Sequence, residues 1–209
     1  FIITDGKSIK FFQTAQDHKR VLEGDKGKNT GGMGAYSPSR LINNKLEKKI
    51  LNKIINPTIR ALGEMGIKYK GFLYAGLMIK ENEPYLIEYN VRMGDPECQT
   101  ILPTLETDLL EIFLACCDKT LDKINIKWKE LKSICIVVCS KGYPDKYEKK
   151  VEIKNIHKIN LGKNEYLFHA GTTAYENNIY AIGGRVLSFV SLSNNYKSAK
   201  KKITKNINN

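Results

Sequence analysis

Apolar and polar residues near the start of the chain alternate in a way that predicts a hairpin followed by a long helix. Residues 1–12 contain two short apolar runs on either side of Asp5-Gly6-Lys7, which is a typical hairpin turn. Residues 44–65 carry apolar side chains at the spacing of one helix face. Pro57 interrupts this stretch and is expected to kink or split the helix, because proline lacks an N–H group and crowds the preceding turn.

A second, more apolar hairpin is predicted further along the chain. Residues 71–80 form a strand so apolar that both of its faces are expected to be covered. Glu81-Asn82-Glu83 then makes a turn into a strand at residues 85–91, which is rich in aromatic and β-branched side chains. A short apolar helix is expected at residues 108–117, with Thr107 as its N-cap.

The pattern becomes richer in strands after residue 130. Strands are expected at residues 133–140, 165–170 and 179–191, and a final helix at residues 195–207. Glycines 183 and 184 fall inside the last strand, where they indicate a bulge or the close approach of a ligand or neighbouring backbone. We therefore predict two domains, at residues 1–130 and 131–209.

The net charge of +12 in 209 residues comes mainly from lysine. Such a balance can serve nucleic acid or anionic small substrates. The lysines are scattered and are densest at residues 197–205, where no aromatic residues alternate with them. We interpret that run as a solvated helix face and expect no nucleic-acid partner.

Signals for membrane insertion and secretion are not found in the sequence. No run of about 18 apolar residues occurs, so no membrane partner is expected. The five cysteines form no C-x-x-C pair and are typical of free thiols in a reducing compartment. A cytoplasmic protein is therefore expected. Because the sequence opens at Phe1 within an expected strand, we also expect it to be a piece of a longer protein.

Three polar side chains of the strand at residues 85–91 and just beyond it suggest a metal and phosphate site. Residues two apart on a strand share a face, so Glu88, Asn90 and Arg92 are expected to project together. Glu88 and Asn90 offer oxygens about 7 Å apart along the backbone, which suits Mg²⁺ completed by water and phosphate oxygens. Arg92 adds a planar cation for a phosphate or carboxylate. The turn that follows, Gly94-Asp95-Pro96-Glu97, adds two more carboxylates.

The loop at residues 23–38 contains five glycines, which let a ligand approach the backbone. Gly31-Gly32-Met33-Gly34 could form a nest of N–H groups for an anion. The loop matches neither a P-loop nor a dinucleotide fingerprint. Asp17-His18-Lys19-Arg20 lies just upstream and favours an anion site over a merely flexible loop.

Several of these motifs occur together in an order that resembles a known family. They are Asp17-His18-Lys19-Arg20, Asn29-Thr30-Gly31-Gly32-Met33-Gly34-Ala35-Tyr36-Ser37-Pro38, Tyr74-Ala75-Gly76-Leu77-Met78, Asn90-Val91-Arg92-Met93-Gly94-Asp95-Pro96-Glu97 and Phe168-His169-Ala170-Gly171-Thr172. The chain resembles the phosphoribosylamine–glycine ligase (glycinamide ribonucleotide synthetase) family of ATP-grasp enzymes. The resemblance covers essentially the whole chain but only the C-terminal portion of the family's length.

The resemblance implies an α+β fold, with the C-terminal part of an ATP-grasp domain at residues 1–130 and a small β-rich domain at residues 131–209. It implies a purine-synthesis reaction in which ATP phosphorylates glycine and the amine of 5-phosphoribosylamine attacks the glycyl phosphate. The cofactors would be ATP and Mg²⁺ or Mn²⁺. The missing N-terminal half of the same enzyme would be a partner, so this fragment is expected to be inactive alone.

The resemblance also implies a role for each matched residue. Glu88 and Asn90 would hold the metal, Leu77 and Glu88 would contact the nucleotide, and Arg92, Asp95 and Glu97 would act in catalysis. The substrate-binding residues would be Asp17, Lys19, Arg20, Asn29, Thr30, Gly31, Gly32, Met33 and Gly34.

Three other interpretations stay open on the sequence. The chain could belong to another ATP-grasp carboxylate–amine ligase or to a carboxylase. It could be a basic nucleic-acid-binding module, for which steep salt dependence of binding would be diagnostic. It could also be a non-catalytic fragment that folds only beside its missing half.

Overall fold

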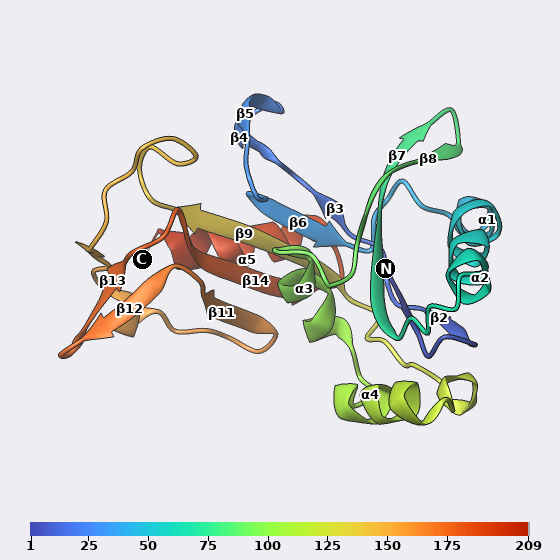
Figure 1. Cartoon of the computed structure of the whole chain (residues 1–209). Coiled ribbons are helices and arrows are strands. Elements are labelled where there is room, and N and C mark those ends of the chain that lie inside the picture. Colours follow the sequence, from blue (N-terminus) through green and yellow to red (C-terminus); the bar gives the residue numbers. More distant parts are fainter. Residues whose placement is uncertain (209) are drawn as a thin grey trace. The chain divides into compact units, whose positions relative to one another are not determined.

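The structure is a computed structural model that describes residues 1–208, and its ribbon is shown in Figure 1. The chain forms two compact units that alternate along the sequence. Unit 1 comprises residues 1–14, 38–94 and 105–129, and unit 2 comprises residues 15–37, 95–104 and 130–209. Each unit is therefore assembled from three separate stretches of the sequence. The division at residue 130 stays a prediction about domains.

Unit 1 is built on a four-stranded antiparallel sheet in the order β2-β1-β7-β8. Its strands are β1 (Ile2–Thr4), β2 (Ile9–Phe11), β7 (Gly71–Lys80) and β8 (Glu83–Asn90). Both predicted hairpins are confirmed: Asp5 to Ser8 separates β1 from β2, and Glu81 and Asn82 separate β7 from β8. The register places Gly76 opposite Glu88 and Tyr74 opposite Asn90.

The predicted long helix is continuous across Pro57 rather than split there. It comprises α1 (Asn44–Ile50), a π-helical segment (Leu51–Ile55) and α2 (Asn56–Glu64). Pro57 lies in the first turn of α2. The wider π-turn directly before it absorbs the irregularity that proline imposes on an α-helix. The buried side chains of this helix pack against the sheet in one core, which contains Ile2, Leu46, Ile50, Ile55, Ile59 and Leu73.

Two details of unit 1 differ from those predicted. Both faces of β7 are not covered along its length, because Met78 is 59% exposed. The N-cap of α4 (Leu109–Asp118) is Asp108 rather than Thr107, since the Asp108 carboxylate accepts the Leu110 N–H at 2.7 Å. A 3₁₀ turn at Leu121–Lys123 follows α4.

Unit 2 is organised around a five-stranded antiparallel sheet in the order β11-β14-β9-β6-β3. Its strands are β3 (Gln16–Asp17), β6 (Gly34–Ser37), β9 (Lys132–Cys139), β11 (Glu165–His169) and β14 (Arg185–Ser193). The pairing of β6 with β9 joins the glycine-rich segment to residues about a hundred positions later. Gly34 permits this pairing, because a Cβ there would lie 2.6 Å from the Cys135 carbonyl oxygen.

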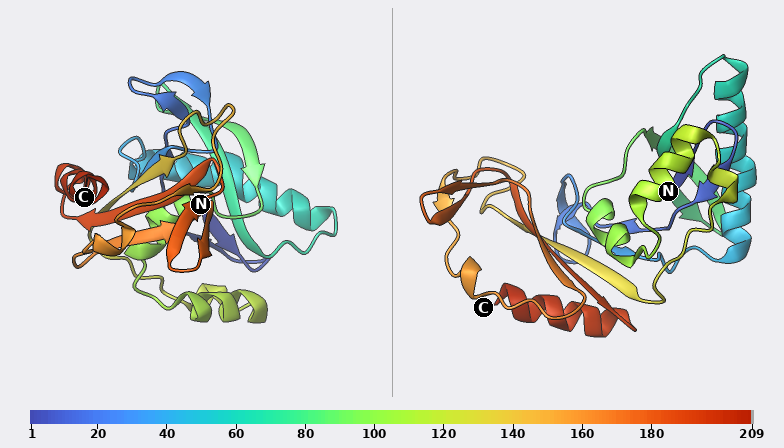
Figure 2. Two further views of the ribbon diagram at one scale, coloured as in Figure 1. Left: turned by 90° about the vertical axis from the view of Figure 1, so that its left-hand side faces the viewer. Right: turned by 90° about the horizontal axis from the view of Figure 1, so that it is seen from below.

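Two helices pack on this sheet. The first is α5 (Tyr196–Ile207), which lies along β14 and β9 (Figure 2) and places Ile203 in a core with Leu187 and Phe189. The second is the short α3 (Glu97–Ile101), which packs against β6 and β9 and continues into a 3₁₀ turn at Leu102–Thr104.

The remaining strands of unit 2 form two small sheets. One is the hairpin of β4 (Arg20–Leu22) and β5 (Lys26–Asn29). The other has the order β10-β13-β12, from β10 (Val151–Glu152), β12 (Thr172–Tyr175) and β13 (Asn178–Ala181), with a 3₁₀ turn at Ile156–Lys158 nearby in sequence. The single strand predicted at residues 179–191 is therefore wrong: Gly183 and Gly184 separate β13 and β14, which belong to different sheets.

The buried Asp5 carboxylate organises the first hairpin. Its Oδ1 atom accepts the N–H groups of Lys7 and Ser8 at 2.9 and 2.6 Å, and its Oδ2 atom accepts the Leu121 N–H at 3.3 Å. Burial raises the pKa of Asp5, but these three donors outweigh it and leave that pKa lowered. One carboxylate therefore ties the hairpin to the turn that follows α4.

We predict that Asp5→Ala lowers the free energy of unfolding by about 2–4 kcal/mol, because it leaves three N–H groups without their charged acceptor. Urea denaturation at pH 7 measures the change. Asp122→Ala is the control, since that side chain is exposed beside the same turn. Equal effects of the two substitutions would contradict the role of Asp5.

Candidate functional site

The predicted site residues fall into two sets, one in each compact unit. Leu77, Glu88, Asn90 and Arg92 belong to unit 1. All of the others belong to unit 2. Each set is described by itself.

Glu88 and Asn90 lie side by side at the end of β8, as the strand periodicity predicts. The Asn90 Nδ2 atom donates to Glu88 Oε1 at 3.1 Å. Gly76 provides the space for this pair, because a Cβ on Gly76 would lie 3.1 Å from the Glu88 Cγ. A glycine opposite the glutamate therefore lets its side chain lie close to the neighbouring strand.

The Glu88–Asn90 pair fits a hard divalent cation. Adjacent oxygens around Mg²⁺ are about 3 Å apart, since the metal–oxygen bonds are about 2.1 Å and nearly octahedral. The two groups are 3.1 Å apart, and rotation of the Asn90 amide would bring its oxygen to the place of its nitrogen. No group of three or more His, Cys, Asp or Glu side chains within residues 1–208 could hold a metal ion. The pair thus suits a cation that takes its other ligands from water and phosphate.

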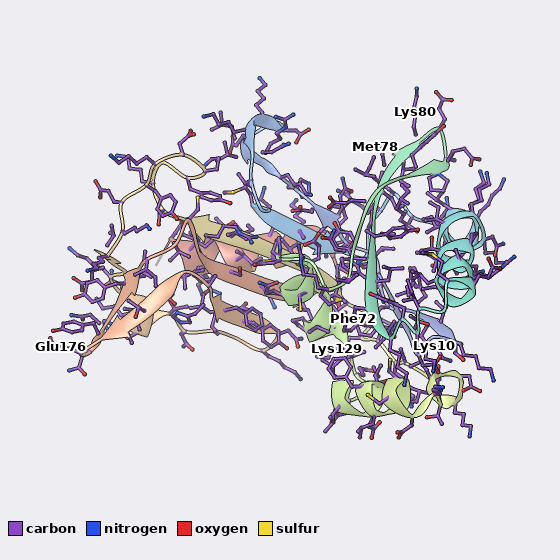
Figure 3. All side chains as sticks on the ribbon, viewed as in Figure 1. Lys10, Phe72, Met78, Lys80, Lys129 and Glu176 are labelled. Carbon is purple, nitrogen blue, oxygen red and sulfur yellow. The ribbon has the colours of Figure 1, made fainter. Side chains whose placement is uncertain are left out.

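Leu77 does not share the face of Glu88. It packs against the helix-covered core together with Ala75, Ile79 and Tyr89. Met78, its neighbour, is largely exposed near the tip of the β7–β8 hairpin (Figure 3). Leu77 is partly buried by this packing, and its contact with a nucleotide stays a prediction.

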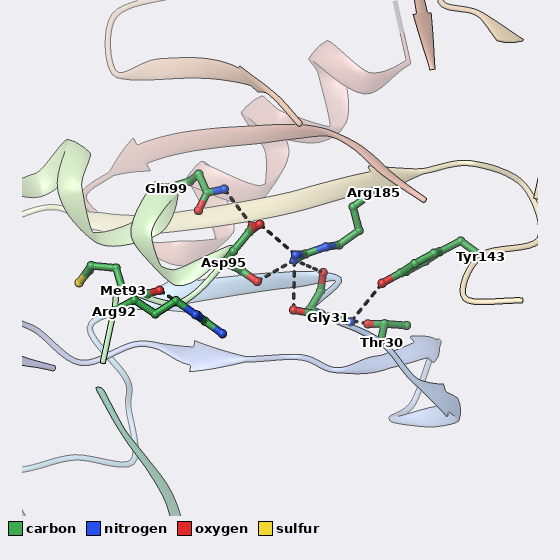
Figure 4. Close-up of polar contacts among 9 residues, drawn as sticks. Thr30, Gly31, Arg92, Met93, Asp95, Gln99, Tyr143 and Arg185 are labelled. Carbon is green, nitrogen blue, oxygen red and sulfur yellow. Dashed lines mark hydrogen bonds and ion pairs between the residues drawn. The ribbon is translucent and has the colours of Figure 1, made fainter. Parts of the chain in front are cut away.

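Arg92 lies beyond the end of the strand that was expected to orient it. β8 stops at Asn90, so the two-residue periodicity no longer applies at position 92. The guanidinium is exposed and donates to the Met93 carbonyl oxygen at 3.0 Å (Figure 4). That Arg92 projects together with Glu88 and Asn90 therefore stays a prediction.

The glycine-rich loop of unit 2 does not form the predicted nest of free N–H groups. The Gly31 N–H donates to the Tyr143 hydroxyl at 3.1 Å, and the Gly32 N–H donates to Thr30 Oγ1 at 3.1 Å. The Met33 N–H donates to the His18 carbonyl oxygen at 2.8 Å. The loop has a fixed backbone whose N–H groups already have partners.

Gly32 is the residue that brings the loop, Asp17 and the Asp95–Glu97 turn together. Its φ of +121° is one that residues with a side chain rarely adopt. A Cβ at this position would lie 2.6 Å from Pro96 Cδ and 2.9 Å from Asp17 Oδ1. The three sequence motifs of unit 2 thus meet where only glycine fits.

Arg185 is a site residue that the sequence analysis missed. Its Nη1 atom donates to the carbonyl oxygens of Asp95 and Gly31 at 2.6 and 3.1 Å, and its Nη2 atom pairs with Asp95 Oδ2 at 2.9 Å (Figure 4). Gln99 Nε2 donates to the other Asp95 oxygen at 2.9 Å. In the sequence, only the Gly183-Gly184 pair directly before Arg185 pointed to this region. It predicted that a ligand or another segment comes close to the backbone there, but not which segment.

Asp17 is a carboxylate in an unusual environment. Its Oδ1 atom is buried and has no hydrogen-bond partner within residues 1–208. Burial raises the pKa of Asp17 to about 7, and the nearby Glu97 carboxylate, itself 4% exposed, raises it as well, whereas Lys19 and Arg185 oppose the rise. A carboxyl group that changes its charge near neutral pH therefore lies beside the loop.

The remaining predicted residues lie at the surface of unit 2. Lys19, Arg20 and Asn29 are exposed, and the Arg20 guanidinium donates to the Gly27 carbonyl oxygen at 2.7 Å. The Thr30 hydroxyl donates to the Lys19 carbonyl oxygen at 2.8 Å, which joins the two motifs. The exposed side chains of Lys19 and Arg20 are therefore accessible to an anionic ligand.

We predict that Asp17→Asn changes the pH dependence of stability. An unfolded aspartate loses its proton near pH 3.9, whereas folded Asp17 keeps it up to about pH 7. The folded state binds more protons between these values, so the contribution of Asp17 is fully present below pH 3.9 and is lost as the pH rises through 7. The free energy of unfolding of the variant should rise relative to that of the wild type across this range, by about 2 kcal/mol at pH 8 when solvent screening of this half-buried group is taken into account.

Thermal unfolding at pH 4 to 8 tests this expectation, with Asp145→Asn as the control because the Asp145 side chain is 62% exposed. A difference between Asp17→Asn and wild type that stays constant with pH would refute it.

Comparisons with known proteins place these motifs in a family. Residues 1–98 match the family described as phosphoribosylglycinamide synthetase, ATP-grasp (A) domain, and residues 133–209 match its C domain. No helix within residues 1–208 is both long enough and apolar enough to cross a membrane.

The relatives that are similar to this chain are phosphoribosylamine–glycine ligases. The chain is 43% identical over 203 residues to the phosphoribosylamine–glycine ligase of Vigna unguiculata, covering 95% of this chain and 65% of that protein. It is 42% identical over 200 residues to that of Caldanaerobacter subterraneus, covering 96% and 47%. The crystal structure of the Thermotoga maritima ligase superimposes with a TM-score of 0.81 at 30% identity, covering 99% of this chain and 50% of that one.

The chain spans about half the length of most of the curated relatives it matches. The predicted α+β class and the predicted resemblance are both confirmed by these matches. The chain belongs to the phosphoribosylglycinamide synthetase family, and it carries the family's ATP-grasp (A) domain followed by its β-rich C domain.

Proposed function

We propose that the full-length protein joins glycine to 5-phosphoribosylamine at the expense of ATP, giving glycinamide ribonucleotide, ADP and phosphate. The observation that carries this proposal is the Glu88–Asn90 pair over Gly76, in a chain that belongs to this family. The pair is a donor set for Mg²⁺ or Mn²⁺, which would neutralise the nucleotide phosphates when bound.

The proposed reaction has two steps. A glycine carboxylate oxygen attacks the terminal phosphorus of ATP, forming glycyl phosphate and releasing ADP. The amine of phosphoribosylamine then attacks the carbonyl carbon, so that a C–N bond forms, the C–O bond to phosphate breaks, and the nitrogen loses a proton. Both nucleophiles belong to substrates, which leaves the protein to position the reactants and neutralise charge.

The residues of unit 1 would serve the phosphoryl-transfer step. Glu88 and Asn90 hold the metal ion, and the exposed Arg92 guanidinium binds the transferred phosphoryl group through its open donors. Arg92 is well suited to this role because its present bond is to a carbonyl oxygen one residue away, not to a carboxylate.

The residues of unit 2 would serve the phosphoribosylamine. The exposed Lys19 and Arg20 attract its phosphate, together with the Asn29-to-Gly34 loop. The carboxylates of Asp95 and Glu97 orient the neutral amine of the substrate by accepting its N–H groups. Asp17 lies next to this turn, with Gly32 between them. Because the chain spans about half the length of most of its relatives, we propose that it is inactive without the rest of the protein. The cytoplasmic location stays a prediction from the cysteine pattern.

The first experiment measures ADP release by the full-length protein with ATP, Mg²⁺, glycine and freshly generated phosphoribosylamine. We expect release that requires both glycine and the amine. Release without glycine, or with another carboxylate in its place, would overturn the proposal in favour of a different ATP-grasp reaction. Tight, strongly salt-dependent binding of nucleic acid with no ADP release would favour the nucleic-acid-binding alternative.

We predict that Glu88→Gln in the full-length protein lowers the metal-dependent rate by about 100-fold or more, because a neutral amide replaces the charged ligand. Titration of Mn²⁺ by electron paramagnetic resonance should show weaker binding in the same variant. The control is Glu81→Gln, the same change at the exposed tip of the β7–β8 hairpin. Unchanged turnover and Mn²⁺ affinity in Glu88→Gln would exclude Glu88 as a metal ligand.

A further inference from the structure

Two side chains of unit 2 outside the predicted site hold the Gly31–Gly32 segment. Tyr143 comes from the turn after β9, and Arg185 begins β14. Neither belongs to the motifs that gave the site its predicted residues. Both reach the glycine-rich loop across more than 110 positions of sequence.

Both polar backbone groups of Gly31 are engaged by this pair. The Gly31 N–H donates to the Tyr143 hydroxyl at 3.1 Å, and the Gly31 carbonyl oxygen accepts from Arg185 Nη1 at 3.1 Å (Figure 4). The same Nη1 atom lies 3.4 Å from the Gly32 carbonyl oxygen. The orientation of this peptide is therefore set from two sides by residues of the C-terminal part of the chain.

Glycines make room for both side chains. A Cβ on Gly31 would lie 3.1 Å from Arg185 Cζ, and a Cβ on Gly184 would overlap the Tyr143 ring. The loop and the β14 start are thus shaped to accept the guanidinium and the ring at close range. A side chain at position 184 would overlap the Tyr143 ring, and one at position 31 would displace the guanidinium.

Arg185 also fixes Asp95, which ties the loop to the turn before α3. Its Nη2 atom pairs with Asp95 Oδ2 and its Nη1 atom with the Asp95 carbonyl oxygen, at 2.9 and 2.6 Å. The Arg185 side chain is 21% exposed, so this ion pair is partly shielded from water. A planar guanidinium can serve these acceptors together, whereas a lysine ammonium cannot match the fork geometry.

We propose that Tyr143 and Arg185 are positioning residues that clamp the Gly31–Gly32 loop and the Asp95 carboxylate in one arrangement for binding phosphoribosylamine. As positioning residues they act through the groups of the protein that the Tyr143 hydroxyl and the Arg185 Nη atoms bind, which are Gly31 and Asp95. The identification of phosphoribosylamine as the substrate rests on the proposed function, whereas the clamp rests on the contacts described above.

The first test measures amide hydrogen exchange at residue resolution in the full-length protein. Tyr143→Phe removes the acceptor of the Gly31 N–H and should speed exchange at Gly31 about fivefold, the effect of one hydrogen bond of about 1 kcal/mol. Tyr147→Phe is the matched control, because it makes the same change four residues away where the hydroxyl forms no hydrogen bond within residues 1–208. Exchange at Gly31 that is unchanged in Tyr143→Phe, or equally fast in both variants, would overturn the clamp.

The second test separates positioning from general stability by steady-state kinetics with each substrate varied in turn. Arg185→Lys should raise the KM for phosphoribosylamine about tenfold and leave the KM for ATP unchanged. Arg185→Lys combined with Tyr143→Phe should raise it by less than the product of the two single effects, because both act on the same peptide.

The outcomes distinguish the clamp from the proposed function. An equal rise in all KM values, or wild-type kinetics in Arg185→Lys, would overturn the positioning role. A full-length wild-type protein without ligase activity would overturn the proposed function, and the exchange measurement would then still decide whether the clamp exists.

Discussion

The antiparallel pairing of β6 with β9 is the constraint on which the arrangement of unit 2 depends. It places β6, and β3 beside it, in one sheet with β9, β14 and β11 from the C-terminal part of the chain. The pairing requires glycine at position 34, where any side chain would meet the Cys135 carbonyl oxygen. Once β6 is fixed there, the glycine-rich loop just before it must lie beside the start of β14 and the turn before α3.

The electrostatics of unit 2 follow from that packing. Three acidic residues from two distant motifs, Asp17, Asp95 and Glu97, lie close to one another beside Gly32, and the repulsion between their charges costs free energy. Arg185 offsets part of this cost by pairing with Asp95. Asp17 is left with a buried oxygen that has no partner within residues 1–208, and its pKa rises to about 7. A group of this kind reduces stability at neutral pH, which is a common property of functional sites.

Unit 1 achieves its local geometry by simpler means. A regular antiparallel register sets Glu88 opposite Gly76, so strand periodicity and one glycine suffice to hold an oxygen-rich pair on the surface. On the helix-covered face of the same hairpin, Leu77 packs against the core. The next residue, Met78, is largely exposed. The hairpin therefore separates a packing face from a face that is open to a ligand.

The sequence by itself determined the features that depend on neighbouring residues. Strand alternation predicted Glu88 beside Asn90, turn residues predicted both hairpins of unit 1, and the order of the motifs identified the family. Only the tertiary structure decided the rest. It showed that the loop N–H groups have internal partners, that the Arg92 guanidinium donates to the Met93 carbonyl oxygen, and that Arg185 and Tyr143 hold Gly31. The physical reason is that periodicity orients side chains only within one element, whereas contacts between segments a hundred residues apart depend on how the sheet assembles.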